Sequence, residues 1–365
     1  MNVPNPMVAE LRQAVPNAAY QEYPRNCWYI VAARDELGTE LLGRQVCGDR
    51  LVMYRKSTGE PVVLADWCPH RGYKLSDSRR VEDTIVCGYH GIAFNAEGKC
   101  VHIPSQKTIP NVMKVRSYPV AEKSFWVWAW MGDPEKADID LLPDSEFFNR
   151  PNHHNRYLAV LPMAGNFQIL HENLIDATHT SYLHEGLVDN EGEDGLASVE
   201  VKAEYGKNFI RTQRDLHDYR PKGFVAQVFQ VEEGRPFLRR LINEHHFPSS
   251  CITVNQLIDP DTGEIVSEQI GMLPVVPETP TTCFHFAAIS SSFPARPREA
   301  EIEFYTSILK QDTLAIESAQ LWANETGAAE ISVRQDEVAI RARRMIAEMV
   351  KEERAVKELQ HVESA

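Results

Sequence analysis

The chain has 365 residues, of which 43% are hydrophobic and 25% charged, an ordinary globular balance with room for one large or two average domains. A formal net charge of −14 argues against general nucleic-acid or anionic-membrane binding, because both need a basic surface. The sequence shows no signal-peptide pattern and no apolar run near the roughly 20 residues that span a bilayer, so we expect a cytoplasmic protein without a membrane segment.

The first part of the chain is predicted to be an antiparallel β domain. After a proline-rich arm over residues 1–25, short aromatic and β-branched runs alternate with polar turns such as Gly48-Asp49. An Asp-, Glu- and Pro-rich stretch over residues 133–151 is predicted to be a linker, which gives domains at 1–150 and 151–365. The expected strands are 27–32, 44–47, 51–54, 62–64, 92–94, 115–118 and 125–131.

Two Cys-His pairs lie in this β domain. Cys68-Pro-His70 is followed, after sixteen residues, by Cys87-Gly-Tyr-His90, each within a Gly- or Pro-containing loop. Seven cysteines, an odd and scattered number, argue against a disulfide framework. A structural zinc site is one interpretation, but zinc fingers usually pair Cys with Cys and His with His. Mixed pairs favour a two-iron cluster with two thiolates on one iron and two imidazoles on the other. Cys100 is interpreted as a free thiol rather than a fifth ligand.

The second part of the chain is predicted to be α+β, with a helix, then strands, then long helices. Residues 166–183 have helical composition, and 304–324 and 331–359 are long, amphipathic and free of proline. The expected strands between them are 199–205, 209–213, 223–229, 251–257, 264–272 and 281–291.

The segment from Asn173 to His184 carries a second concentration of ligand-type side chains. Asp176 and His179 are three residues apart and are expected to face the same side of a helix. His184 follows five residues later, so the helix must end, widen or become a loop between His179 and His184 if both imidazoles are to reach one ion. Two histidines and a carboxylate form the facial triad of non-haem Fe(II). Asp176 could be that carboxylate or could hydrogen-bond a ligand.

These motifs resemble those of the Rieske non-haem iron aromatic oxygenases, in particular the vanillate O-demethylase branch. The resemblance implies an all-β Rieske domain followed by a helix-grip catalytic domain, with Cys68, His70, Cys87 and His90 on a [2Fe–2S] cluster. It implies mononuclear Fe(II) on His179, His184 and Asp312, with Glu317, Glu325 and Asp336 as alternatives to Asp312. Asp176 would bridge His179 to a cluster histidine across the subunit interface of a head-to-tail trimer. Asn173 would lie near the iron.

We therefore predict the terminal oxygenase component of a system that uses O₂ to hydroxylate or O-demethylate a small aromatic substrate, for instance an aromatic acid. No G-x-G-x-x-G motif is present, so NAD(P)H is expected to act only through a separate reductase or ferredoxin. Arg71, Lys74, Arg79 and Arg80 could steer that partner, or could be a solvated loop. The alternatives are a ring-hydroxylating or diaryl-ether-cleaving dioxygenase and, more remotely, a Rieske electron carrier. His245, His246 and His285 are candidate polar anchors for substrate.

Overall fold

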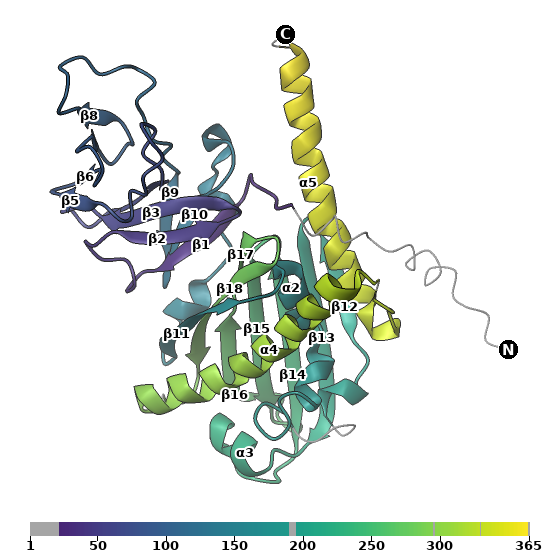
Figure 1. Cartoon of the computed structure of the whole chain (residues 1–365). Helices are drawn as coiled ribbons and strands as arrows, with labels where there is room; N and C mark the ends of the chain where they lie inside the picture. Colours follow the sequence, from purple (N-terminus) through teal and green to yellow (C-terminus); the bar gives the residue numbers. More distant parts are fainter. Residues whose placement is uncertain (1–21, 190–194, 295, 329, 364–365) are drawn as a thin grey trace. The chain divides into compact units, whose positions relative to one another are not determined.

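The computed structural model describes residues 22–189, 195–294, 296–328 and 330–363. The chain divides into two compact units between Leu142 and Pro143, within the stretch predicted to be a linker. Arg25–Leu142 forms one unit, and Pro143–Ala365 forms the other together with the short segment that ends at Pro24. Figure 1 shows a β-rich unit and a unit with one large sheet and the long helices. The predicted α+β class is confirmed.

The first unit consists of three small antiparallel sheets, ordered β1-β10-β9, β2-β3-β4 and β5-β6-β7-β8. The residues of β1 and β10 are all buried, which explains their continuous apolar sequences. The strands are β1 (Trp28–Ala33), β2 (Leu42–Val46), β3 (Asp49–Arg55), β4 (Pro61–Ala65), β5 (Arg79–Val81), β6 (Thr84–Val86), β7 (Ala93–Phe94), β8 (Cys100–His102), β9 (Val120–Lys123) and β10 (Trp126–Trp130). The short 3₁₀ helices η2 (Pro134–Lys136) and η3 (Ile139–Leu141) end this unit.

The predicted strand over 115–118 is wrong. This segment makes only isolated bridges, such as Leu64↔Ser117. Its backbone hydrogen bonds are divided between two neighbours, because Val115 N–H donates to the Gly98 carbonyl and Tyr118 N–H donates to the Val63 carbonyl. A continuous ladder therefore does not form.

The second unit is built on an eight-stranded antiparallel sheet. Its order is β11-β18-β16-β15-β14-β13-β12, with β17 paired to β18. The strands are β11 (His154–Met163), β12 (Lys202–Gly206), β13 (Phe209–Tyr219), β14 (Phe237–His246), β15 (Ser250–Ile258), β16 (Ile265–Met272), β17 (Val275–Thr279) and β18 (Thr282–Ser291). The helices are α2 (Phe167–Ile175), α3 (Gly223–Phe229), α4 (Arg298–Thr326) and α5 (Glu337–Glu363), with 3₁₀ helices η4 (Glu146–Asn149), η5 (Ala177–Ser181), η7 (Leu196–Ser198) and η8 (Arg334–Asp336).

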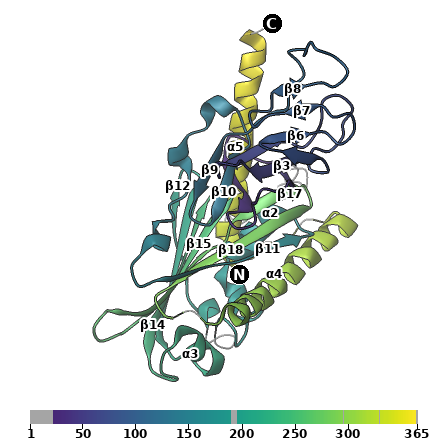
Figure 2. The ribbon, with the colours of Figure 1, turned by 90° about the vertical axis from the view of Figure 1, so that its left-hand side faces the viewer.

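Helix α4 lies along one face of this sheet, as the two perpendicular views show (Figures 1 and 2). Leu309 of α4 packs with Leu158 of β11 and with Ala287 and Ile289 of β18. Helix α2 contacts both α4 and α5. Helices α2 and α4 thus both pack on the sheet, and α4 carries Asp312, one of the candidate metal residues of this unit.

Three element predictions in this unit are wrong. The helix expected over 166–183 ends at Ile175, because Asp176 is extended (φ −94°, ψ 95°) and starts the separate turn η5. Residues 223–229 form a helix rather than a strand, with Val225, Val228 and Phe229 buried at helical spacing. The last helix begins at Glu337 rather than at 331. Strands β11, β14 and β17 were not anticipated.

Candidate metal centres

The two Cys-His loops of the first unit have the same backbone geometry. Gly72 N–H donates to the Cys68 carbonyl and Gly91 N–H to the Cys87 carbonyl, both at 2.9 Å. In each loop the cysteine N–H also donates to the carbonyl of the residue five positions later, from Cys68 to Tyr73 and from Cys87 to Ile92. Both glycines have positive φ, 67° and 72°, which side-chain-bearing residues rarely adopt. Two loops with the same backbone hydrogen bonds therefore each present one Cys-His pair, with the histidine two residues after Cys68 and three residues after Cys87.

These loops bring like residues together in pairs. The thiols of Cys68 and Cys87 are buried, and burial together with the neighbouring Cys87 thiol raises the pKa of Cys68 to about 11. The rings of His70 and His90 lie 4.6 Å apart between centroids and are exposed. Two adjacent thiols in a buried site become thiolates only if a cation joins them. A buried thiol pair beside an exposed imidazole pair fits a cluster whose two irons have different ligands.

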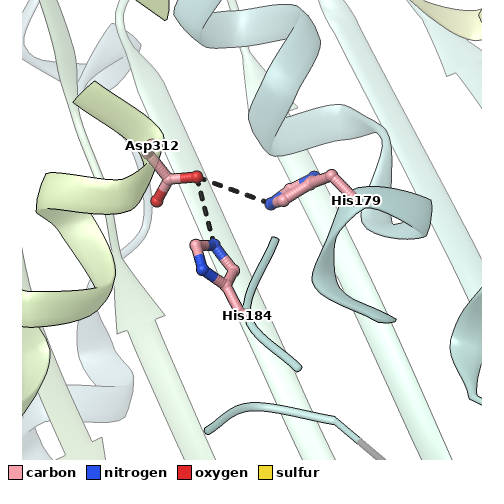
Figure 3. Close-up of side chains that lie close together, drawn as sticks. All are labelled: His179, His184 and Asp312. Atoms are coloured by element: carbon pink, nitrogen blue, oxygen red, sulfur yellow. Dashed lines mark hydrogen bonds and ion pairs between the residues drawn. The ribbon is translucent and has the colours of Figure 1, made fainter. Parts of the chain in front are cut away.

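The second centre brings together His179, His184 and Asp312 (Figure 3). The Nε2 atom of His184 lies 3.1 Å, and that of His179 3.6 Å, from the same oxygen of Asp312. His179 belongs to η5, His184 follows that turn, and Asp312 comes from α4 across 128 residues of sequence. Two imidazoles and one carboxylate with their ligand atoms within 4.8 Å fit a facial triad.

Neighbouring groups fix both imidazoles with Nε2 toward the centre. His179 Nδ1 donates to the Asp176 carbonyl at 2.5 Å, and His184 Nδ1 lies 2.8 Å from Oε1 of Gln311. Such contacts set the tautomer and the ring orientation of metal-binding histidines. The extended backbone at Asp176 makes the first contact possible, because it breaks the helix and aims its carbonyl at His179.

The electrostatics of the triad suit a divalent cation. Burial lowers the pKa of His179, although Asp312 opposes the change. Burial also lowers the pKa of His184, but the hydrogen bond and charge of Asp312 outweigh burial and leave the pKa raised. Burial raises the pKa of Asp312, and its interactions with His184 reverse the sign, so its pKa is lowered. A proton shared by this pair occupies the position that a metal would take.

A cavity of about 160 Å³ opens beside the triad. A dry cavity of about 150 Å³ in another protein holds benzene, so one aromatic ring fits a space of this size. Its wall contains all three triad residues, and the remaining side chains are mostly apolar. The polar exceptions outside the triad are Thr180, Arg239, Asn243, Thr253, Asn255, Gln269 and Tyr305.

Comparison with known families decides the classification. The profile of the vanillate O-demethylase oxygenase C-terminal domain matches residues 163–352, just over half of the chain, and that of the Rieske [2Fe–2S] domain matches residues 27–119. The chain belongs to the vanillate O-demethylase oxygenase family. The family predicted from the sequence motifs is confirmed.

The vanillate O-demethylase oxygenase subunit of Pseudomonas sp. (strain HR199 / DSM 7063) is 34% identical over 162 residues, which cover 44% of this chain and 45% of that relative. This match therefore spans less than half of the relative's length. The oxygenase component of dicamba O-demethylase from Stenotrophomonas maltophilia is 28% identical over 336 residues, covering 89% of this chain and 97% of that one. A crystal structure of dicamba monooxygenase bound to 3,6-dichlorosalicylic acid superposes with a TM-score of 0.83 at 25% identity, covering 92% and 99% of the two chains. A structure of that enzyme with non-haem iron and dicamba superposes at 0.76 and 26% identity, covering the same shares.

The other carboxylates considered as ligands lie elsewhere in this family member. Glu317 accepts a hydrogen bond from Ala164 N–H, Asp336 accepts one from Val333 N–H, and Glu325 is exposed. The Asp176 carboxylate accepts hydrogen bonds from the backbone and hydroxyl of Thr178 and lies 3.9 Å from Arg214. The expectation that Asp176 and His179 share a helix face is wrong, because α2 ends at Ile175 and Asp176 is the extended residue before η5. The Oδ1 atom of Asn173, on α2, is buried without a hydrogen-bond partner.

The remaining candidates from the sequence do not line the cavity. His245 contacts His171 and Cys251, and the His246 ring packs at a tilt against Phe209. Both ring nitrogens of His285 are buried without a partner. Arg80 pairs with Asp83, whereas Arg71 and Arg79 are exposed. No disulfide joins any of the seven cysteines, all of which lie in the described residues, and the Cys100 thiol donates to the His102 carbonyl.

Sequence reasoning missed Gln311 and the polar residues of the cavity wall. Gln311 directly precedes Asp312 and could have been noticed from that position. Asn243 and Asn255 carry no such signal, because only the strand register places them on the inner face. In the described residues, no helix is both long and apolar enough to cross a membrane.

Proposed function

We propose that the chain is the terminal oxygenase component of a multicomponent system that hydroxylates or O-demethylates a small aromatic substrate. The observation that carries the proposal is the triad of His179, His184 and Asp312 in the wall of a mostly apolar cavity, in a chain that also contains a Rieske domain. The names of the relatives, which include vanillate and dicamba O-demethylases, support this reaction class.

In this proposal Cys68, His70, Cys87 and His90 hold the [2Fe–2S] cluster, and His179, His184 and Asp312 hold mononuclear Fe(II). The donor sets fit both groups, and the imidazoles of the triad are already oriented by Asp176 and Gln311. When bound, the mononuclear iron supplies O₂ activation, with electrons delivered one at a time from the cluster.

The protein's own part is to bind and orient the ring and to exclude water. Leu241, Leu273 and Ile308 are among the apolar side chains that shape the cavity. Asn243 is almost completely buried and faces the cavity, so its amide is available to a polar substituent. The Tyr305 hydroxyl accepts a hydrogen bond from Gln269 and keeps its proton, because burial raises its pKa. These neutral groups orient a ring so that one carbon faces the triad.

For a methyl ether, the methyl carbon becomes a hydroxymethyl group, and the resulting hemiacetal breaks its C–O bond to release formaldehyde and a phenol. One oxygen atom of O₂ enters the methyl carbon, and the other leaves as water with two electrons and two protons. The electrons come from NAD(P)H through a separate reductase or ferredoxin, because the chain has no G-x-G-x-x-G motif. Exposed Arg71 and Arg79, near the cluster loops in sequence, are proposed to attract that partner.

We further propose a head-to-tail homotrimer in which Asp176 connects His179 to a cluster histidine of the neighbouring copy, with Asn173 close to the iron. The Asp176 carboxylate is partly exposed, which leaves it accessible to a second chain. A heterologous contact that closes into a ring has the required symmetry.

The deciding experiment supplies the purified protein with a surrogate reductase, NADH and ¹⁸O₂, and screens methoxylated aromatic acids and their neutral analogues. We expect substrate-dependent NADH consumption with formaldehyde release in step. One labelled oxygen per turnover, found in the formaldehyde or in a hydroxylated product, supports monooxygenation. Two labelled oxygens in a cis-dihydrodiol favour the dioxygenase alternative. Protein that contains the cluster but binds no mononuclear iron favours the electron-carrier alternative.

A further inference from the structure

A fully buried ion pair lies next to the histidine-bearing segment. Asp189 and Arg239 both have 0% side-chain exposure, and a guanidinium N–H of Arg239 donates to Oδ1 of Asp189. Arg239 also donates to the Val188 carbonyl, to Asn255 and to the Tyr219 hydroxyl. Burying two charges is expensive, and such pairs are often no more stabilising than apolar residues of the same size. Fold stability alone is therefore a weak reason for this pair.

The second oxygen of Asp189 binds the chain on which the triad depends. It accepts a hydrogen bond from the Ser181 hydroxyl and another from Leu196 N–H, both at 2.7 Å. Ser181 is completely buried and lies between His179 and His184 in sequence. Its hydroxyl also accepts from Ala197 N–H at 3.2 Å. One carboxylate thus connects the segment between two triad histidines to β14 and to η7.

The packing around this carboxylate leaves no spare room. A Cβ atom at Gly195 would lie 2.4 Å from Oδ2 of Asp189 and 2.6 Å from the Ser181 oxygen. Both distances are far inside normal contact, so glycine is the residue that permits the Ser181–Asp189 hydrogen bond. The N–H groups of Leu187 and Val188 donate to the His184 carbonyl, which ties the stretch before Asp189 directly to a triad residue.

We propose that Asp189 is a positioning residue that, anchored by Arg239 and linked through Ser181, fixes the segment from His179 to His184 in the geometry that the iron requires. The inference rests on the proposed iron site. Rigid support of this kind matters because a ligand segment outside regular helix has few other restraints, and outer contacts typically change metal affinity by about 10- to 100-fold. Arg239 and Val188 also line the cavity, so the same pair forms part of its wall.

Two substitutions break the connection by independent means. Ser181→Ala removes the hydroxyl and leaves the ion pair, and Gly195→Ala inserts a methyl group between Ser181 and Asp189. The matched control for the first is Ser267→Ala, because Ser267 is a buried serine of the same unit that donates to the Phe229 carbonyl. The control for the second is Gly206→Ala, where a new Cβ would meet nothing closer than 3.4 Å.

The measurement is Co(II) binding to protein that retains its cluster but has been freed of mononuclear iron by chelation. Affinity is obtained by titration, ligand geometry from the electron paramagnetic resonance spectrum of the bound cobalt, and folding from thermal unfolding. We expect both test variants to lose at least about tenfold in Co(II) affinity and to show an altered spectrum. Both controls are expected to bind like the unsubstituted protein, even where their unfolding temperature falls.

Test variants that bind Co(II) with the affinity and spectrum of the controls would overturn the positioning role. If one test variant fails to fold, the other still decides the question. Failure of the unsubstituted protein to bind Co(II) at the triad is a different result, because it removes the proposed iron site itself. Loss of binding in His184→Ala and retention in Ser181→Ala would keep the iron site and reject only the role of Asp189.

Discussion

Asp312 differs from Glu317, another carboxylate on α4, in its burial and in its partners. It is 3% exposed and within 3.1 Å of His184, whereas Glu317 is used by the Ala164 backbone. Asp312→Asn keeps the shape but removes the charge, so we expect loss of the mononuclear iron and of activity with the cluster retained. Glu317→Gln, the control on α4, should keep both and lose about 1 kcal/mol of stability. Iron content per chain, compared with cluster absorbance, checks the result; iron retained in Asp312→Asn contradicts the assignment.

His70 determines the redox potential in the proposed cluster. Imidazole ligands raise the potential of a two-iron cluster above the roughly −400 mV of an all-cysteine one, because they carry less negative charge than thiolates. His70→Cys is therefore expected to lower the potential while a cluster still assembles. Cys100→Ser is the control, since the Cys100 thiol donates to the His102 carbonyl and Cys100 is not one of the proposed ligands. Potentiometric titration measures both, and an unchanged potential in His70→Cys excludes this histidine as a ligand.

His171 links stability to pH. Burial lowers its pKa from 6.5 to about 4, with a smaller lowering contribution from His285, and its ring nitrogens lie 3.3 Å from Nδ1 of His245 and 2.7 Å from the Pro248 carbonyl. A folded-state pKa below the unfolded value means that stability is present above pH 6.5 and lost as pH falls toward 4. The loss for this one group approaches about 3 kcal/mol.

The pH effect has a direct test. His171→Phe should be less stable at pH 7.5, because the hydrogen bond to Pro248 is lost, yet should lose less stability between pH 7 and pH 5 than the unsubstituted protein. His217→Asn, at an exposed position, should keep the original pH dependence. Urea unfolding at a series of pH values gives the comparison, and parallel curves for His171→Phe argue against a role for this residue.

Sequence reasoning could name the proposed metal ligands because their chemistry depends on residue type and local spacing. Cys68-Pro-His70 and Cys87-Gly-Tyr-His90 are short enough to be read as loops. It did not reach the pair of Asp189 and Arg239, because 50 residues separate them and only the sheet register turns Arg239 inward. A buried arginine has no signature in a single sequence until its partner is known.

The geometry of the proposed iron site depends on the break between α2 and η5. Asp176 ends the helix in extended conformation and caps the next turn, accepting from Thr178 N–H at 3.0 Å. The spacing of His179 and His184 predicted an interruption between these two residues, whereas the α-helix already ends at Ile175, before His179. The strand β14 could not be predicted, since its inward positions include Arg239, Asn243 and His245 and so lack apolar alternation. The run over 223–229 was misassigned because short apolar segments suit strand and helix equally.

Asp176→Asn separates the role of Asp176 as the N-cap of η5 from its proposed role in electron transfer. Asparagine caps as well as aspartate, so η5 and both metals should be retained. We expect electron transfer from the reduced cluster to the mononuclear site to become much slower, because the charged bridge is lost. Stopped-flow measurement of cluster oxidation with O₂ and substrate reports the rate. Thr178→Val keeps the carboxylate and should remain fast, and loss of iron in Asp176→Asn would instead make Asp176 a support of the ligands.

At the scale of the whole molecule, the proposed trimer requires electrons to pass between chains, which can be tested by mixing inactive subunits. Cys87→Ala is expected to lack the cluster, and Asp312→Asn to lack the mononuclear iron, so neither is active alone. In a head-to-tail ring assembled from equal amounts of both, about a quarter of adjacent pairs place an intact cluster next to an intact iron site. Co-expression of the two chains with different tags should therefore restore about a quarter of the normal activity per chain. Mixing Asp312→Asn with His179→Asn, which both lack the iron, should restore none. If the mixture of Cys87→Ala and Asp312→Asn is also inactive although the tagged chains co-purify, electron transfer stays within one chain. Asp176 then does not act across an interface.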